Sequence, residues 1–191
     1  DVAKLVLKCI EDWRNKGWHP NDVKRNVSLE WLNVVILYEL YRAECSLMKT
    51  IDFSDLILYA TRLLEYDEKL RLYCRSHLFE HLLIDEAQDT SLSQMQLIDV
   101  LVRSHQDARI QQKNRSFEPK LVENNLMIVG DDYQAIHEWR GAHVKNILDF
   151  ETNFDNVRTI ILKKNYRSFE PIIKVAENVI QNNKYQKHNK K

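Results

Sequence analysis

Acidic and amide side chains follow a short apolar run of this sequence, and their types suit the chemistry of a nucleotide. Residues 82–84 (Leu-Leu-Ile) lead directly into Asp85 and Glu86, with Gln88 and Asp89 close behind. A carboxylate at the end of a buried strand can hold Mg²⁺, and its neighbour can orient and deprotonate an attacking water. We therefore predict a metal role for Asp85 and a water-activating role for Glu86. A solvated acidic turn at the end of a strand is the alternative.

A second apolar run, residues 126–129, ends in Gly-Asp-Asp at residues 130–132. Gln134 follows, and a neutral amide in this place can sense a terminal phosphate through a hydrogen bond without adding charge. Trp139 and Arg140 come next, and an exposed aromatic ring beside a cation suits stacking on a nucleic-acid base. The alternatives are an ordinary turn glutamine, a tryptophan in the core and an arginine paired with a nearby acid.

A third apolar run, residues 157–162, is rich in β-branched side chains and precedes Tyr166 and Arg167. A tyrosine can stack on a purine, and an arginine can bind a phosphate through two parallel hydrogen bonds. Simple packing of this pair on the next helix is the alternative. A phosphate-binding loop needs Gly-Lys-Ser/Thr after a strand, and none of the three glycines here precedes a lysine. We therefore expect that the isolated chain does not hydrolyse a nucleotide.

The elements that must position these side chains form an α/β pattern. The first 75 residues follow a helical period, with a stop at Gly17 and candidate N-caps at Ser28 and Asp52. Three short strands are then expected at 82–84, 126–129 and 157–162, with helices over 94–102, 144–150 and from Ser168 to about 181. Residues 104–125 read as a long surface loop and residues 182–191 as a frayed tail. Core positions are expected for Trp13, Trp18 and Trp31.

Charge and cysteine content limit the class of protein. Lysine plus arginine and aspartate plus glutamate both number 28, so nucleic-acid binding cannot be argued from net charge and must be local. Cys9, Cys45 and Cys74 are far apart in apolar-periodic stretches, which predicts reduced core thiols and a cytoplasmic or nuclear location. No apolar run reaches the length of a membrane span, so no membrane partner is expected.

Taken together, the boxes resemble those of the UvrD/Rep-like branch of superfamily 1 DNA helicases. The similar segments are Asp-Phe-Ser-Asp-Leu at residues 52–56, Asp-Glu-Ala-Gln-Asp-Thr at 85–90, the Gly-Asp-Asp-Tyr-Gln box within 129–142, and Asn-Tyr-Arg-Ser at 165–168. Their order and apolar flanks fit along residues 50–180. The resemblance implies a partial RecA-like parallel sheet of the P-loop NTPase type, preceded by a helical insertion subdomain.

The resemblance implies roles on the nucleotide side of the site. Asp85 would serve Mg²⁺ and Glu86 would activate water for ATP hydrolysis. Tyr166 would stack on adenine, and Arg167 would reach the γ-phosphate in both binding and catalysis.

The resemblance also implies a link between ATP and a strand of single-stranded DNA. Gln88 and Gln134 would couple the γ-phosphate to the DNA groove, and Arg140, with Asp89, would tie this segment to the nucleotide. Trp139 would stack on a base. His137 stands where the family usually has an aromatic residue, so this second DNA-binding position departs from the pattern.

By this resemblance, residues 1–75 would belong to the insertion subdomain. Residues 76–168 would form the C-terminal part of the first motor domain, and residues 169–191 the start of the second motor domain or a linker. The phosphate loop and the second motor domain would be partners from the same polypeptide. These sequence segments do not distinguish single-stranded DNA from RNA as the nucleic acid that is bound. A non-hydrolysing nucleic-acid or protein interaction module that keeps the fold is the main alternative, and a metal-dependent nuclease is a weaker one.

Overall fold

The computed structural model describes residues 2–79, 81–102, 126–154, 156–180 and 182. The loop expected at 104–125 and nearly all of the tail expected at 182–191 lie outside these residues. None of the described helices is long and apolar enough to cross a membrane.

The N-terminal helices pack around a small apolar core of their own. They are α1 (Val2–Asn15), α2 (Pro20–Asn26) and α3 (Leu32–Leu47), with a 3-10 turn, η1 (Leu29–Trp31), before α3. Ile10, Trp13, Val23, Val35 and Tyr38 are the buried residues of this core. The expected stop after α1 is confirmed, because Gly17 takes a positive φ of 76° that favours glycine.

Two sequence expectations in this region are wrong. Trp13 is buried and Trp18 is half-buried, but Trp31 is 40% exposed and stands at the edge of the core. Its place in a 3-10 turn, outside the helical period of α3, explains the difference. Ser28 precedes that turn but makes no capping bond with its side chain.

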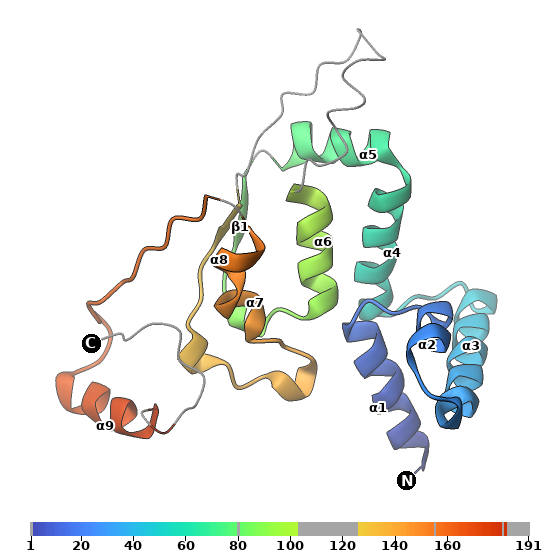
Figure 1. Ribbon diagram of the computed structural model, residues 1–191, viewed down its shortest axis with the longest axis horizontal. Helices are drawn as coiled ribbons and strands as arrows, with labels where there is room; N and C mark the ends of the chain where they lie inside the picture. Colours follow the sequence, from blue (N-terminus) through green and yellow to red (C-terminus); the bar gives the residue numbers. More distant parts are fainter. Residues whose placement is uncertain (1, 80, 103–125, 155, 181, 183–191) are drawn as a thin grey trace, which may run out of the picture.

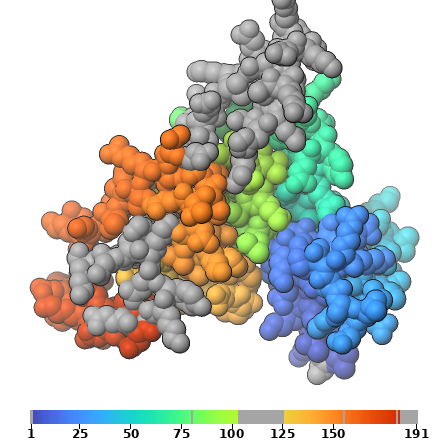
Figure 2. All heavy atoms as spheres, in the orientation of Figure 1, coloured from blue at the N-terminus to red at the C-terminus, as the bar shows by residue number. Residues whose placement is uncertain are grey.

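Two further helices join the N-terminal helices to the sheet. They are α4 (Phe53–Tyr66) and α6 (Leu92–Val102), and they pack side by side (Figure 1). Asp52 caps α4 as expected, because its carboxylate accepts a hydrogen bond of 3.0 Å from the Asp55 amide. A short helix, α5 (Glu68–Tyr73), and a π-helical turn (Cys74–Leu78) follow α4. In the space-filling view of Figure 2, α6 lies between α4 and the C-terminal segments, and the N-terminal helices lie below α4.

The described sheet has two parallel strands, β1 (Leu82–Ile84) and β2 (Leu126–Ile128). Leu82 pairs with Leu126 and Ile84 with Ile128, so both strands end at the same level. Two short helices, α7 (Lys145–Leu148) and α8 (Phe150–Asn153), replace the single helix expected over 144–150. The α/β expectation holds at this coarse level, as a largely helical chain with a small parallel sheet.

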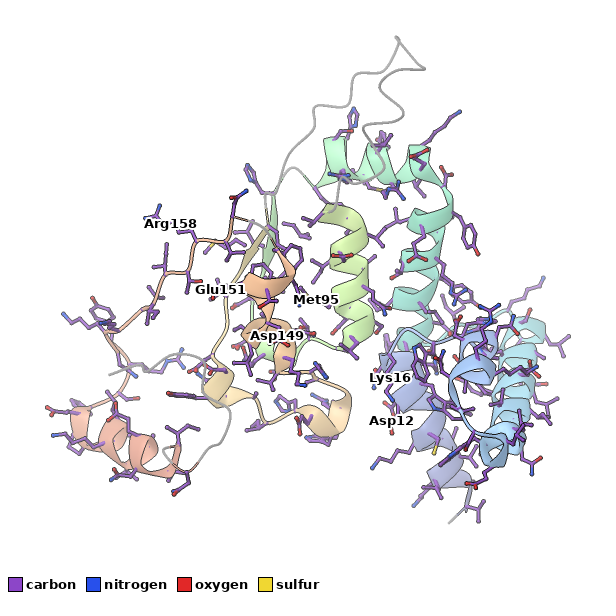
Figure 3. The ribbon with its side chains drawn as sticks, in the orientation of Figure 1. Asp12, Lys16, Met95, Asp149, Glu151 and Arg158 are labelled. Atoms are coloured by element: carbon purple, nitrogen blue, oxygen red, sulfur yellow. The ribbon has the colours of Figure 1, made fainter. Side chains whose placement is uncertain are left out.

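The third expected strand, over 157–162, is not part of the described sheet. This segment runs as extended chain away from β1 and β2 toward α9 (Glu170–Ile180) (Figure 1). Its apolar side chains stay open to solvent, with Ile160 68% and Leu162 86% exposed. Arg158, labelled in Figure 3, also points outward from it. A strand requires a neighbouring strand for its hydrogen bonds, and no described strand lies beside this segment.

Candidate functional site

The buried side chain of Gln88 joins the ends of the two strands. β1 and β2 are continued by hydrogen bonds from the Val129 amide to the Ile84 carbonyl (2.7 Å) and from the Ala87 amide to the Val129 carbonyl (2.9 Å). Just beyond, Gln88 is 1% exposed. Its Nε2 donates to Glu86 Oε2 at 2.7 Å, and its Oε1 accepts from the Asp131 amide at 3.0 Å. One side chain therefore positions both the carboxylate after β1 and the loop after β2.

Glycine is required at residue 130 by this close approach. A Cβ built there would lie 2.6 Å from Gln88 Oε1, 2.9 Å from Ile147 Cδ1 and 3.1 Å from the Ala87 amide nitrogen. Any larger residue would push the Gln88 amide away from its two partners. Gly130, in the Gly-Asp-Asp segment, thus leaves space for the side chain of Gln88, which belongs to the Asp-Glu-Ala-Gln-Asp-Thr segment at residues 85–90.

Asp85 and Glu86 are both exposed at the carboxyl end of β1. The Glu86 amide donates to Asp85 Oδ1 at 2.9 Å, and Glu86 has a φ of 50° and a ψ of 45°, in the left-handed region. A non-glycine residue in this region is uncommon, and such strain gathers at functional sites. The left-handed turn places two carboxylates at one strand end, where they face solvent.

These carboxylates fit a magnesium ion that keeps much of its water. Among the described residues, no group of three or more histidine, cysteine, aspartate or glutamate side chains could hold a metal ion. Mg²⁺ is commonly held by only one or two carboxylates together with water and substrate phosphates. The exposed carboxylate of Asp85 therefore suits Mg²⁺ bound with water and a nucleotide, beside the carboxylate of Glu86, and does not suit an all-protein metal cage.

Gln134 is connected to Gln88 through Asp131. Asp131 Oδ1 accepts from the Tyr133 amide at 3.1 Å, and Asp131 Oδ2 accepts from Gln134 Nε2 at 2.9 Å. Since the Asp131 amide donates to Gln88, the two glutamines belong to one chain of hydrogen bonds across the strand ends. A movement of either glutamine side chain would therefore disturb the hydrogen bonds of the other.

His137, Trp139 and Arg140 form an aromatic and cationic segment, η6 (Glu138–Arg140) with its preceding residue. The Arg140 guanidinium lies 5.1 Å from the centroid of the Trp139 ring, and the His137 ring meets that ring edge-on at 6.3 Å. Trp139 is 73% exposed, so the reading of this residue as a core anchor is wrong. The ring stands free on the surface with a cation beside it.

Asp89 lies next to the histidine of this segment. Its Oδ2 is 4.0 Å from His137 Nε2, so the acid faces the histidine of the segment. Asn146 holds the same region from below, because its Nδ2 donates to the Thr90 carbonyl (3.0 Å) and to Thr90 Oγ1 (3.1 Å). Sequence reasoning missed Asn146, since an asparagine in a short helix carries no signal of a buried contact with a distant turn.

Tyr166 and Arg167 lie apart from the carboxylates. Tyr166 is 85% exposed with the Lys164 ammonium 4.9 Å from its ring centroid, and Arg167 is exposed as well. Asn165 Oδ1 accepts from the amides of Arg167 (2.8 Å) and Ser168 (3.0 Å), which fixes the turn before α9. No described contact joins this turn to Asp85 or Glu86.

The box at residues 52–56 forms a charged junction between helices. Asp55 is 2% exposed, and its Oδ1 accepts from Arg42 at 2.6 Å and lies 3.3 Å from Arg14 Nη2. Arg14 also pairs with Asp52, whose other oxygen accepts from the Tyr41 hydroxyl at 2.5 Å. Burial raises the pKa of the Tyr41 hydroxyl, so it stays a donor. This network fixes α1 and α3 on α4.

The end of α1 is in turn held against the site. Asn15 Nδ2 donates to the Arg140 carbonyl at 3.3 Å, and Gln96 Nε2 on α6 donates to the Lys16 carbonyl at 3.2 Å. Gly141, with φ 86°, leaves no room for a Cβ next to Asn15. These contacts therefore hold the N-terminal helices in a defined position next to the segment that carries Trp139.

Several known proteins are similar to this chain over nearly its whole length. The sequence model of the UvrD/REP helicase N-terminal domain matches residues 2–155. ATP-dependent DNA helicase Rep of Buchnera aphidicola is 37% identical over 183 residues, which cover 95% of this chain and 24% of that protein. DNA helicase II of Rickettsia typhi is 33% identical, covering 96% of this chain and 25% of that protein. ATP-dependent DNA helicase PcrA of Staphylococcus epidermidis is 30% identical, covering 96% and 23%. The chain thus spans about a quarter of the length of these relatives.

Proposed function

Because the chain belongs to the UvrD/REP helicase N-terminal domain family, we propose that it is part of an ATP-driven motor that moves along single-stranded DNA. The motor would be complete only in a longer polypeptide, of which this chain would carry the carboxylate and coupling half of the ATP site. Its two-stranded sheet would be a portion of a RecA-like sheet, with residues 1–75 as an insertion subdomain. The chain alone would not hydrolyse ATP.

The observation that carries this proposal is the bridge made by Gln88. A buried amide that bonds the Glu86 carboxylate on one side and the Asp131 amide on the other links a candidate base to the loop of Gln134. Asp131 then bonds Gln134, which precedes Trp139 by a few residues. A change at the nucleotide would therefore reach Gln134 through hydrogen bonds, and the exposed tryptophan through the short backbone segment, residues 135–138, that lies between them.

The chain's own residues divide the hydrolytic work. Glu86 would accept a proton from the attacking water, and Asp85 would hold a magnesium ion through water. Bound Mg²⁺ would supply charge neutralisation at the β- and γ-phosphates. Arg167 and Tyr166 would come to the nucleotide from the segment before α9, with the guanidinium on the γ-phosphate and the ring on adenine.

On the DNA side, Trp139 would stack on one base of the strand. Its exposure of 73% and the guanidinium of Arg140 beside it support this role. His137 would add a second ring, edge-on to Trp139. Because its Nε2 lies 4.0 Å from Asp89 Oδ2, His137 would also connect the DNA strand to the residues that follow β1. The relatives named as ATP-dependent DNA helicases support DNA as the track.

ATP turnover by the full-length protein tests this proposal. Glu86→Gln should lower turnover by about 10²- to 10⁴-fold while ATP affinity is retained, because a general base is lost and Asp85 still serves the metal. Glu65→Gln, on the exposed face of α4, is the matched control and should turn over ATP like the parent. Equal turnover by the parent and Glu86→Gln would contradict the role of Glu86. A parent without any ATP turnover would favour a non-hydrolysing interaction module.

A further inference from the structure

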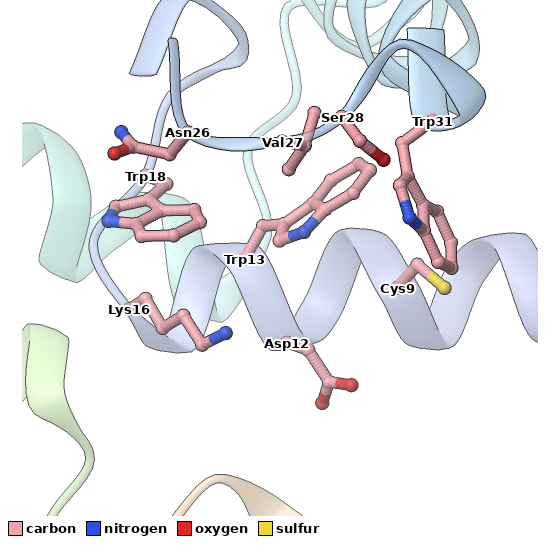
Figure 4. Close-up of a pocket in the computed structure, with 9 residues that line it drawn as sticks. All are labelled: Cys9, Asp12, Trp13, Lys16, Trp18, Asn26, Val27, Ser28 and Trp31. Carbon is pink, nitrogen blue, oxygen red and sulfur yellow. The ribbon is translucent and has the colours of Figure 1, made fainter. Parts of the chain in front are cut away.

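A pocket of about 400 Å³ opens beside α1, on the N-terminal helices. Indole rings form much of its wall, from Trp13, Trp18 and Trp31 (Figure 4). Trp13 is buried, and Trp31 meets it edge-on, with ring centroids 6.2 Å apart and an angle of 80° between the planes. Since Trp31 is 40% exposed, this pocket presents open aromatic surface on a buried aromatic support.

Polar and charged groups surround these rings. The Lys16 ammonium lies 5.0 Å from the centroid of the Trp18 ring, and Lys16 is itself exposed. Asp12 and Ser28 also line the pocket and offer a carboxylate and a hydroxyl. A flat aromatic ligand with hydrogen-bonding edges and a neighbouring negative charge matches this set, because the rings stack, the polar groups bond the edge and the ammonium meets the charge.

The pocket adjoins the segment of Trp139. Lys16 follows Asn15, whose side chain bonds the Arg140 carbonyl at 3.3 Å. Figure 3 shows Asp12 and Lys16 on the side of α1 that faces the sheet-bearing half of the molecule. The end of α1, just before Lys16, is therefore held next to the segment that carries Trp139.

We infer that this pocket binds an unpaired base of the same DNA strand, stacked on Trp31, with Lys16 on an adjacent phosphate. The inference rests on the proposed function and adds a second base-binding position on the helical segment. Continuity with Trp139 and the presence of an exposed ammonium favour a nucleic-acid strand over an apolar side chain of a protein partner. A strand held at both positions would be held across the junction that Asn15 makes between α1 and η6.

The test measures the affinity of the full-length protein for single-stranded oligonucleotides by fluorescence anisotropy. Trp31→Leu should weaken binding by about tenfold, the loss expected for one base–aromatic stack, and Trp31→Phe should retain most of the affinity. Lys16→Gln should reduce the slope of log affinity against log salt by about 0.7, as for one phosphate contact on a single strand. Leu29→Ala is the matched control, because Leu29 is 82% exposed in the same 3-10 turn and does not line the pocket.

The result that overturns the inference alone is a Trp31→Leu protein that binds DNA like the parent while Trp139→Ala binds more weakly. A parent that binds no single-stranded DNA would instead overturn the proposed function. If Trp31→Leu lowers the melting temperature as well as the affinity, photo-crosslinking of the parent to 5-iodouracil DNA decides. A covalent link mapped to Trp31 supports the inference, and links that all map elsewhere overturn it.

Discussion

The contacts of Gln88 predict a stability effect that can be worked out group by group. In Gln88→Leu, the Asp131 amide loses its acceptor at 3.0 Å, and the Glu86 carboxylate loses its donor at 2.7 Å. Glu86 is exposed, so water can replace the lost donor there. The half-buried Asp131 amide is harder to resolvate, and an unsatisfied group of this kind costs about 1–3 kcal/mol. We therefore expect the free energy of unfolding to fall by about 2 kcal/mol.

Gln88→Glu should be worse than Gln88→Leu at neutral pH. The new carboxylate would be buried beside Glu86, and an uncompensated buried charge costs about 3–5 kcal/mol. Burial and the like charge would raise the folded-state pKa of the introduced carboxyl. Stability would therefore be lost as pH rises from about 4.3, the usual value for glutamate, through that raised value, and regained on acidification.

Urea denaturation of the purified chain measures both variants, with Asn33→Leu as the control. Asn33 is exposed on α3, and its replacement should change the free energy of unfolding by less than about 0.5 kcal/mol. If Gln88→Leu is as stable as the Asn33 variant, the bridge between the two strand ends contributes nothing, and the proposed route from nucleotide to Trp139 loses its physical basis.

Four further changes follow from the structure. Gly130→Ala should destabilise the chain by about 1–3 kcal/mol, because its Cβ would lie 2.6 Å from the side-chain oxygen of Gln88, Oε1. Urea denaturation measures this loss of stability. Trp139→Ala should weaken single-strand binding by the full-length protein by about 1–3 kcal/mol and leave the melting temperature unchanged, since the ring is exposed. Burial, together with two nearby arginines, lowers the pKa of His19 below 6.5. As pH drops below about 6.5, the unfolded chain therefore takes up the proton before the folded chain does, and the melting temperature should fall. The fall should be shallower in a His19→Gln variant. Arg167→Lys in the full-length protein should reduce ATP turnover by about 10³-fold or more with little change in folding, because lysine lacks the planar fork; parental turnover would remove Arg167 from the site.

The strand ends could be predicted from the sequence because their signals are local. Short apolar runs that end in polar residues predicted β1 over Leu82–Ile84 and predicted β2 to within one residue, since β2 ends at Ile128 and the expectation ended at 129. The carboxylate of Asp52 was recognisable as a cap for α4. Gly17 likewise ended α1 through its positive φ. These features depend on residues a few positions apart, which a sequence displays directly.

The features that depend on distant neighbours could not be predicted in this way. A third strand over 157–162 has the right composition, yet a strand exists only where another strand lies beside it. The bonds of Gln88 to Asp131, across 43 positions, and the left-handed backbone of Glu86 have no local signal either. Trp31 was misplaced because its exposure depends on how η1 turns away from the core.

ATP-dependent strand displacement by the full-length protein tests the central claim most directly. The substrate is a duplex with a single-stranded tail, and the comparison is with the Glu86→Gln variant. We predict that the parent separates the strands only when ATP and Mg²⁺ are present, and that the variant binds the tail with parental affinity but separates no strands. A parent that binds the tail tightly and displaces nothing in the presence of ATP would contradict the motor and leave a nucleic-acid interaction module in its place.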